Sequence, residues 1–191
     1  IPPRHGEDPM RAAACAVDIT PVVGVNHSDP IFMAGFGNDR HATGVNDPLW
    51  ARGVVFESDG KKIALVTLDV VGYFYNEVQT IRSLVDPARG FDEIIVSSTH
   101  NHEGPDTMGL WGPDETTSGV DTGYLDFVND AVVDCIHQAD DALVSPPSAS
   151  GRTAWPSARS SRISPSTSPS SGCVSWRPRG IPARSSTPRC R

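Results

Sequence analysis

The stretch with the clearest structural signal is Glu93-Ile-Ile-Val-Ser-Ser-Thr-His100-Asn-His102-Glu-Gly-Pro-Asp106. Its apolar run from Ile94 to Val96 is typical of a buried strand. Small hydroxyl residues follow the run, then two histidines separated by one residue, then a Gly-Pro turn. The stretch therefore predicts a strand that ends in a polar, histidine-bearing loop at one edge of a sheet.

The two histidines of this stretch indicate a metal site. In extended backbone, side chains at i and i+2 point the same way, so His100 and His102 are expected to face one pocket. Imidazole is the commonest protein ligand for metals near neutral pH, and carboxylates such as those of Glu103 and Asp106 often complete the coordination. We interpret the pattern as half of a metal site, although two histidines in a polar turn are often simply solvated.

The chain before this stretch predicts two further strands and a helix. Residues 50–58 and 62–70 are rich in β-forming residues and are separated by Asp59-Gly60, which is a strong hairpin signal. The second run is almost continuously apolar, as in a strand that is buried on both faces. Asn76 is expected to cap a helix that extends to about Val85.

A strand, a helix and a strand of these lengths form a βαβ unit, which makes the two strands parallel. Asp69, at the end of the first of these strands, is then expected at the same sheet edge as His100. Ligands gather at the carboxyl ends of such strands. Asp69 is therefore either a site residue or a carboxylate that caps a neighbouring turn.

Two more elements complete the predicted fold. Ala12 to Ile19 is expected to form a first strand, and residues 124–143 an amphipathic helix packed on the sheet, with His137 on its surface. The fold class is therefore α/β: a mixed sheet with a hairpin, a βαβ unit and covering helices, as an incomplete domain. An incomplete sheet leaves an exposed edge and apolar patches, so poor solubility is expected.

Two long irregular stretches accompany these elements. Residues 22–48 include Met33-Ala-Gly-Phe-Gly37, whose glycines serve either as turn formers or as points of close approach between backbone and ligand. Residues 107–123 are rich in Gly and Asp and carry Trp111. We expect them to form a lid or a pocket wall.

Charge is distributed unevenly along the chain. All 23 acidic residues and 8 of the 16 basic ones lie in residues 1–145, a formal charge of −15. Such an acidic body argues against nucleic acid or an anionic membrane surface as its partner and favours a divalent cation or a neutral substrate. No stretch approaches the length of a transmembrane helix.

The four cysteines show no C-x-x-C spacing and predict neither a zinc knuckle nor a disulfide framework. Cys15 and Cys135 lie in apolar runs and are expected to be buried free thiols. Because the chain begins at Ile1 without a methionine, an upstream segment is expected to have been removed or left out. No signal peptide is visible in the sequence.

The composition changes abruptly at Pro146. Residues 146–191 hold 13 Ser, 8 Pro and 8 Arg, with no acidic residue, so they are expected to form a disordered tail. The tail is interpreted as a genuine basic segment for acidic partners, as a linker, or as out-of-frame translation of a GC-rich coding sequence. We favour the third interpretation, because the change directly follows a well-formed helix.

Five motifs appear in the order that is typical of one protein family. Together they resemble the N-terminal part of the catalytic domain of the neutral/alkaline, non-lysosomal ceramidases and their bacterial relatives, over residues 12–145. The ordered set is far more specific than H-x-H alone. The motifs are Ala16-Val-Asp-Ile-Thr-Pro21, Met33-Ala-Gly-Phe-Gly37, Asn46-Asp-Pro-Leu-Trp-Ala-Arg52, Ala64-Leu-Val-Thr-Leu-Asp69 and Ser98-Thr-His-Asn-His-Glu-Gly-Pro105.

The resemblance implies a zinc-dependent amidase that hydrolyses the N-acyl bond of a lipid amide such as ceramide, giving sphingosine and a fatty acid. By similarity to the family's T-H-T-H-S-G-P motif, His100 is expected to bind Zn²⁺ and His102 to lie beside the reacting amide as a catalytic residue. Zinc polarises a carbonyl, and a nearby imidazole can donate to the developing oxyanion. The resemblance also implies a secreted or periplasmic location.

Two departures from the family pattern limit this expectation. Asn101 and Glu103 stand where the family has Thr and Ser, and with Asp106 they predict a more acidic pocket, which weakens the case for ceramide itself. The family's second zinc histidine, its serine nucleophile and its Glu and Tyr ligands have no counterpart in residues 146–191. Because a catalytic zinc normally has three protein ligands, we expect the chain to be inactive alone.

Two other functions fit parts of the pattern. In metal hydrolases of the metallo-β-lactamase type an apolar strand also runs into T-H-x-H, but Asp-His normally follows, and here Glu103-Gly104 stands instead. A non-catalytic acidic module that binds a metal ion or a partner is the other alternative. The sequence does not define the acyl substrate or the oligomeric state.

Overall fold

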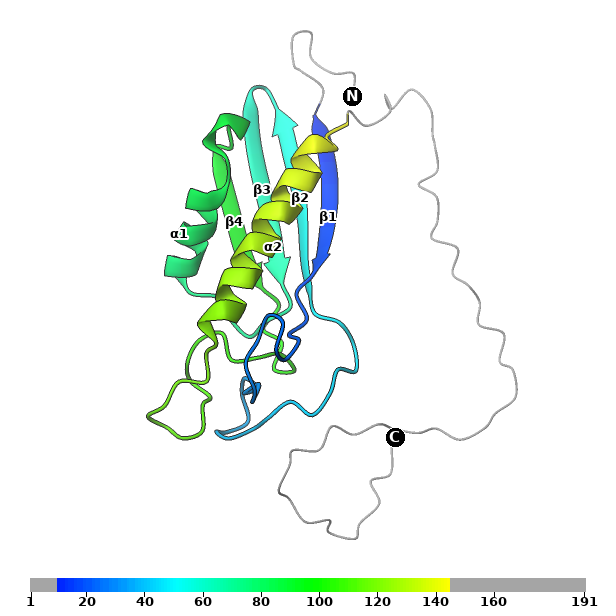
Figure 1. Ribbon diagram of the computed structural model, residues 1–191. Coiled ribbons are helices and arrows are strands. Elements are labelled where there is room, and N and C mark those ends of the chain that lie inside the picture. The colour runs from blue at the N-terminus through cyan, green and yellow to red at the C-terminus, as the bar shows by residue number, and fades with distance from the viewer. Residues whose placement is uncertain (1–9, 145–191) are drawn as a thin grey trace, which may run out of the picture.

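The computed structural model describes residues 10–144. Its centre is a four-stranded sheet with the strand order β1-β2-β3-β4, and Figure 1 shows two helices lying on it. The predicted tail lies outside the described residues. The elements are β1 (Arg11–Asp18), β2 (Trp50–Ser58), β3 (Lys61–Leu68), α1 (Tyr75–Leu84), the short 3-10 helix η1 (Pro87–Arg89), β4 (Glu93–Ser98) and α2 (Thr122–Asp141).

The sheet is mixed, as the sequence predicts. β1 pairs with β2 and β2 with β3 in antiparallel fashion, while β3 and β4 are parallel. The hairpin turns at Asp59 and Gly60, both with positive φ, which matches the right-handed twist of the strands on either side. β3, α1 and β4 form the expected βαβ unit. The α/β fold class is therefore confirmed.

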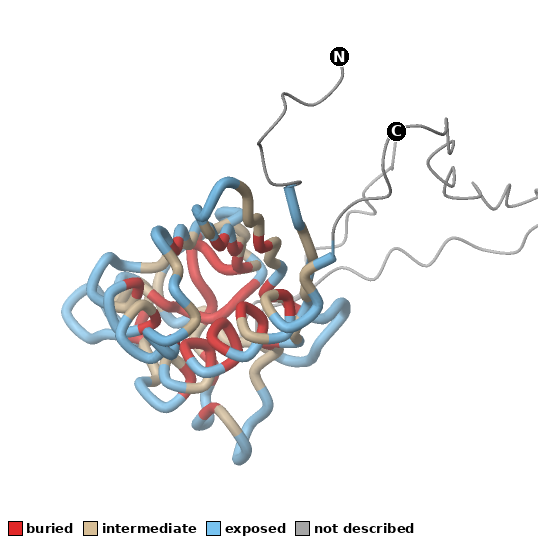
Figure 2. The backbone as a smooth tube through the Cα atoms, turned by 90° about the horizontal axis from the view of Figure 1, so that it is seen from above, coloured by how far each residue is buried: buried red, intermediate tan, exposed pale blue. Residues whose placement is uncertain are grey.

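Both helices cover the same face of the sheet. Figure 1 shows α2 crossing the sheet along its length and α1 beside β4, and Figure 2 shows the buried residues gathered in the middle of the body. Alternate strand residues such as Val55 and Val66 meet Ile81 of α1 and Ile136 of α2 in one hydrophobic core. Alternating residues of the strands and the residues on one face of each helix are thus buried in a single shared layer.

The opposite face of the sheet is not covered by any described helix. Leu65 and Ile95 are paired neighbours on β3 and β4, Ile63 lies two residues from Leu65, and all three side chains are exposed. A sheet face of this kind is normally buried against a second layer. The observation agrees with an incomplete domain; poor solubility remains a prediction.

One cap was wrongly predicted. α1 begins at Tyr75, its N-cap residue is Phe74, and no described side chain caps it. The Asn76 amide instead donates to the Glu77 carboxylate at 2.7 Å. The helix still forms because Val78 and Ile81 are buried against the core.

The prediction of free thiols was also wrong. Cys15 of β1 and Cys135 of α2 form a disulfide, with their Cα atoms 5.3 Å apart. Gly53, on β2 beside Cys15, makes room for it, since a Cβ at Gly53 would lie 3.0 Å from the Cys15 sulfur and 3.3 Å from the Cys135 sulfur. The bond fixes α2 to the edge strand of the sheet.

The long loops gather at one end of the sheet, where β1, β3 and β4 all end (Figure 1). They are residues 19–49, 69–74 and 99–121. Ligand sites of α/β sheets lie at this end. Among the described residues no helix is long and apolar enough to cross a membrane.

Candidate functional site

The parallel pairing of β3 and β4 continues past the ends of both strands. The Thr99 amide donates to the Leu68 carbonyl at 2.9 Å, and the Asn101 amide donates to the Val70 carbonyl at 3.2 Å. The loop that follows β4 is therefore held against the loop that follows β3. This pairing delivers His100 to the sheet edge, as predicted.

The backbone at His100 is not extended, contrary to our expectation. β4 ends at Ser98, and His100 has a φ of +61°, in the left-handed region that is uncommon for residues other than glycine. The ring is held by a contact of 2.7 Å between Nδ1 and the carbonyl oxygen of Val71. Since a carbonyl only accepts, Nδ1 is the donor in this contact, which in the neutral imidazole leaves the lone pair on Nε2.

The two histidines nevertheless meet. Nε2 of His102 lies 3.2 Å from Nε2 of His100, and the rings cross nearly at right angles. Because Nε2 of His100 is the acceptor, Nε2 of His102 is the donor in this contact. His102 thus directs its N–H at the nitrogen lone pair of His100.

Residues from both long loops, 19–49 and 99–121, lie beside the two histidines. The rings of Phe36 and Trp111 lie 5.2 and 6.2 Å from the His102 ring, centroid to centroid. Gly35, with a φ of +77°, lies under the imidazole so closely that a Cβ there would overlap with it. The close approach at Gly35 is therefore to a histidine of the chain itself, and the expected approach of this segment to a ligand stays a prediction.

Asp106 does not belong to the pocket. Its carboxylate is buried and accepts hydrogen bonds from the backbone amides of Met108, Gly109, Trp111 and Gly119, at 2.8 to 3.3 Å. Such a carboxylate organises its loop and is not available to a metal. The expectation that Asp106 makes the pocket more acidic was wrong.

Glu103 is also engaged. Its carboxylate accepts from the Arg40 guanidinium at 3.0 Å, so its negative charge is balanced. Its backbone amide donates to the Asn101 side chain at 2.8 Å, which closes the turn between them. Asn101 and Glu103 therefore shape the turn that carries His102.

The role of Asp69, left open by the sequence, is structural. Its carboxylate accepts from the Trp50 amide at 3.1 Å and from the Arg52 guanidinium at 2.9 Å. These contacts tie the end of β3 to the start of β2. Asp69 lies at the expected sheet edge, but its carboxylate faces β2.

The donor set suits a metal ion in part. Among the described residues the only hydrogen-bond partner of His100 Nε2 is the His102 Nε2–H, and a backbone carbonyl orients the ring from behind, which is an arrangement common to metal-binding histidines. Within residues 10–144 no group of three or more His, Cys, Asp or Glu side chains converges on one point. The described residues thus bring two histidines together without a third side chain that could complete a metal site.

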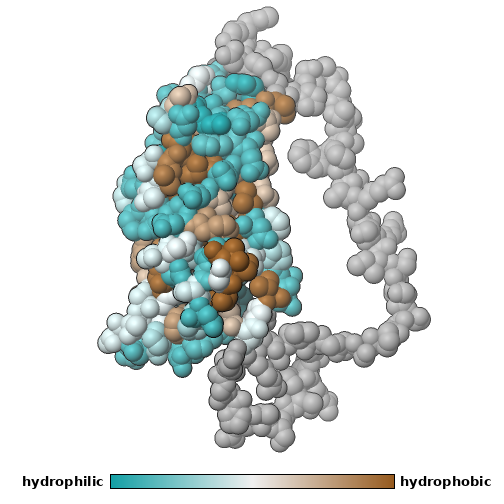
Figure 3. All heavy atoms as spheres, in the orientation of Figure 1, coloured by the Kyte–Doolittle hydropathy of each residue, from teal (hydrophilic) through white to brown (hydrophobic). Residues whose placement is uncertain are grey.

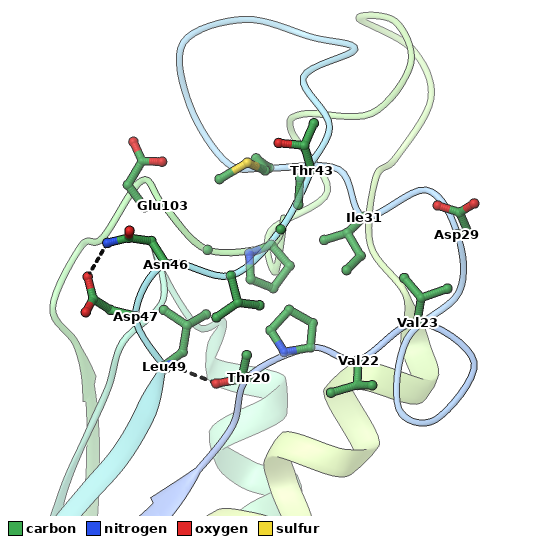
Figure 4. A pocket seen from close by; sticks show the side chains of 17 residues that line it. Thr20, Val22, Val23, Asp29, Ile31, Thr43, Asn46, Asp47, Leu49 and Glu103 are labelled. Carbon is green, nitrogen blue, oxygen red and sulfur yellow. Dashed lines mark hydrogen bonds between the residues drawn. The ribbon is translucent and has the colours of Figure 1, made fainter. Parts of the chain in front are cut away.

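An apolar cavity of about 420 Å³ lies next to the turn formed by Glu103, Gly104 and Pro105. Figure 4 shows Ile31, Leu49, Val22 and Val23 around its interior, with the polar side chains of Asn46, Asp47 and Glu103 on one side. Figure 3 shows hydrophobic patches reaching the surface of the helix-bearing face. The cavity is of a size and character that suit an apolar group.

Sequence reasoning found the two histidines and missed their supports. The Val71 carbonyl has no sequence signal at all, because every residue carries one. Arg40 is one basic residue in a long loop and gave no signal either. Gly35 was singled out, although the sequence left its role open.

No protein-family model and no curated protein matches the sequence. Solved structures do match. The neutral ceramidase from Pseudomonas aeruginosa superimposes with a TM-score of 0.56 at 21% identity, and a ceramidase complexed with C2 with a TM-score of 0.55 at 21% identity. Each match covers 72% of this chain and 22% of the other, so the chain spans about a fifth of their length. The ceramidase-like fold is thereby confirmed.

Proposed function

We propose that this chain carries the histidine-bearing part of a zinc-dependent amide hydrolase of the ceramidase type. The observation that carries the proposal is the His100–His102 pair, whose Nε2 atoms lie 3.2 Å apart at the loop end of the sheet. The fold shared with bacterial neutral ceramidases supports it. The substrate class is a lipid amide of the ceramide kind.

In this proposal His100 is a zinc ligand through Nε2. The Val71 carbonyl fixes the tautomer and the ring orientation that the role requires. Zinc, when bound, supplies a Lewis acid for the amide carbonyl and lowers the pKa of a bound water. One histidine ligand falls short of the three protein ligands of a catalytic zinc, so residues 10–144 are expected to show no turnover alone.

His102 has a different role. Its Nε2–H donates to Nε2 of His100 in this structure. With the His100 lone pair on a metal ion, the same N–H would donate to the oxygen that becomes negative as the amide is attacked. The rings of Phe36 and Trp111 lie beside the His102 ring and support its position. We propose His102 as the catalytic residue of the described chain.

The apolar cavity supports a lipid-like substrate. Its lining includes Glu103, the residue after His102, although neither His100 nor His102 lines it. The overall negative charge argues for a neutral substrate. Ceramide and its relatives are neutral amides with long apolar chains.

The disulfide bears on the location of the protein. Disulfides persist in oxidising compartments and are rare in the cytosol. The Cys15–Cys135 bond is consistent with a chain that folds outside the cytosol. We propose a secreted or periplasmic location.

A chimera tests the proposed function. Residues 10–144 replace the superimposed segment of the Pseudomonas aeruginosa enzyme, and hydrolysis of an N-acyl sphingoid amide is measured. We expect hydrolysis that falls at least 100-fold with His100→Ala and is unchanged with His137→Ala, a histidine on α2 away from the site. A folded chimera whose hydrolysis does not depend on residue 100 would contradict the proposal.

A further inference from the structure

Arg40 joins the two loops that meet at His102. Its Nη1 donates to the Ala34 carbonyl at 2.8 Å and to the His102 carbonyl at 3.0 Å, while Nη2 contacts the Glu103 carboxylate at 3.0 Å. Only 14% of its side chain is exposed. One guanidinium therefore bonds residues that are more than 60 positions apart in the sequence.

The contacts extend a small backbone pairing between the same loops. The Ala34 amide donates to the Gly104 carbonyl at 3.0 Å, and Met33 and Pro105 form an isolated β-bridge. At the His102 end of this pairing, the Arg40 guanidinium bonds a carbonyl of each loop. Its guanidinium also lies 5.2 Å from the centre of the Phe36 ring, which itself contacts the His102 ring.

The His102 ring has little else to hold it. Among the described residues its Nδ1 is buried without a hydrogen-bond partner, and its only ring contact by hydrogen bond is the one to His100. The orientation of the ring therefore depends on its packing against Gly35 and on the position of its own backbone. Arg40 bonds the carbonyls of Ala34 and His102, which lie on the two sides of that packing contact.

We propose that Arg40 is a positioning residue that holds the His102 imidazole against Gly35 and thereby sets its place beside His100. The role of Arg40 in placing the His102 ring does not depend on the zinc site; only the expected effect on metal binding rests on the proposed function. Arg40 touches the His102 main chain and not the ring nitrogens, so it acts through His102. A planar guanidinium donates in several fixed directions at once, which an ammonium on a flexible stem does not reproduce.

The test compares Arg40→Gln and Arg40→Lys with Arg52→Gln as a matched control. Arg52 also pairs with a carboxylate and stacks on an aromatic ring at this end of the sheet, but among the described residues it has no hydrogen bond or ion pair with the loop that carries His100 and His102. Binding of Co²⁺, a spectroscopic substitute for zinc, is followed by visible absorption in the full chain. Urea unfolding of each variant separates a local effect from loss of the fold.

We expect both Arg40 variants to lose at least tenfold in Co²⁺ affinity with an altered absorption band, and Arg52→Gln to stay within twofold of the parent. Unchanged affinity and spectrum in a folded Arg40→Lys or Arg40→Gln variant would overturn the inference. If Arg40→Gln does not fold, Arg40→Lys, which keeps the charge, decides.

A second measurement does not need the metal. In the parent chain the Gly35 α-protons and the His102 ring should give a nuclear Overhauser effect, because the ring lies on Gly35. The inference expects this effect to weaken in Arg40→Lys and to persist in Arg52→Gln. A parent chain that binds no Co²⁺ would refute the zinc proposal, and an effect retained in Arg40→Lys would refute the role of Arg40.

Discussion

Gly35 lies beneath the imidazole of His102 so closely that a Cβ at position 35 would overlap with Nδ1 of the ring. The contact joins the Met33–Gly37 segment to the H-x-H segment, two motifs that are far apart in the sequence. It makes the place of His102 dependent on the absence of a side chain at residue 35. The first prediction follows from this relationship.

Gly35→Ala is expected to displace the His102 ring and to weaken zinc binding about tenfold, a typical loss when the support of a metal site is disturbed. Gly24→Ala is a matched control, because Gly24 has the same φ of +77° and no described atom within 4 Å of the added Cβ. Both variants should lose about 1 kcal/mol of stability through the positive φ. Calorimetric zinc titration checks the difference; equal zinc affinity in the two variants would refute the role of the contact.

Asp106→Ala should destabilise the loop between β4 and α2. The substitution leaves several backbone amides of that loop without their buried acceptor, and we expect a loss on the order of 2–4 kcal/mol in the free energy of unfolding. Asp114→Ala, in the same loop but exposed, should cost much less. Urea unfolding measures both, and equal losses would count against an organising role for Asp106.

The disulfide should contribute strongly to stability. Its cysteines are 120 residues apart in sequence, for which the chain-entropy model gives about 5 kcal/mol. The double variant Cys15→Ala/Cys135→Ala is expected to unfold at lower urea concentration than the parent, and a reductant should shift the parent to the same midpoint while leaving the variant unchanged. A parent midpoint that does not respond to full reduction would show that the bond is not formed.

The carboxyl group of Asp121 makes the stability of the fold depend on pH in the acidic range. Hydrogen bonds from the Ser28 hydroxyl and amide and from the Tyr124 amide, together with nearby His27, lower the pKa of Asp121 to about 2. Because this pKa lies below the unfolded value of about 3.9, the stabilisation is complete above pH 4 and is lost as the pH falls toward 2.

Ser28→Ala should raise the pKa of Asp121 and flatten the dependence of stability on pH between 4 and 2. Carboxyl titration by ¹³C NMR and urea unfolding across this range provide the measurement. Ser83→Ala is the control, because the Ser83 hydroxyl bonds a carbonyl within α1 and has no contact with Asp121 among the described hydrogen bonds. An Asp121 pKa that is the same in parent and Ser28→Ala would contradict the assignment.

The local features of the fold were predictable from sequence because their causes are local. The Asp59-Gly60 turn and the apolar run of β3 define the hairpin, and the spacing of apolar residues in α2 defines its buried face. Parallel pairing of β3 and β4 then follows from the helix between them. These steps need only neighbouring residues.

The other features of the fold and site depend on contacts between residues that are distant in sequence, or on backbone groups that every residue has. Cys15 and Cys135 are 120 residues apart, and nothing local distinguishes a buried thiol from half of a disulfide. Asp106 looks like a metal ligand until its backbone amide partners are known. The left-handed backbone at His100 occurs where the loop after β4 pairs with the loop after β3. The two rings therefore meet through this loop geometry and not through the alternation of side chains along a strand.

The proposed zinc site is tested most directly by calorimetric titration of Zn²⁺ into the full chain, with His100→Ala and the control His137→Ala. We expect one zinc ion per chain in the parent and in His137→Ala, and at least a 100-fold loss of affinity in His100→Ala, because Nε2 of His100 is the proposed ligand, oriented by the Val71 carbonyl. Zinc binding of equal affinity in His100→Ala, or no binding by the folded parent chain, would contradict a metal site at this histidine pair.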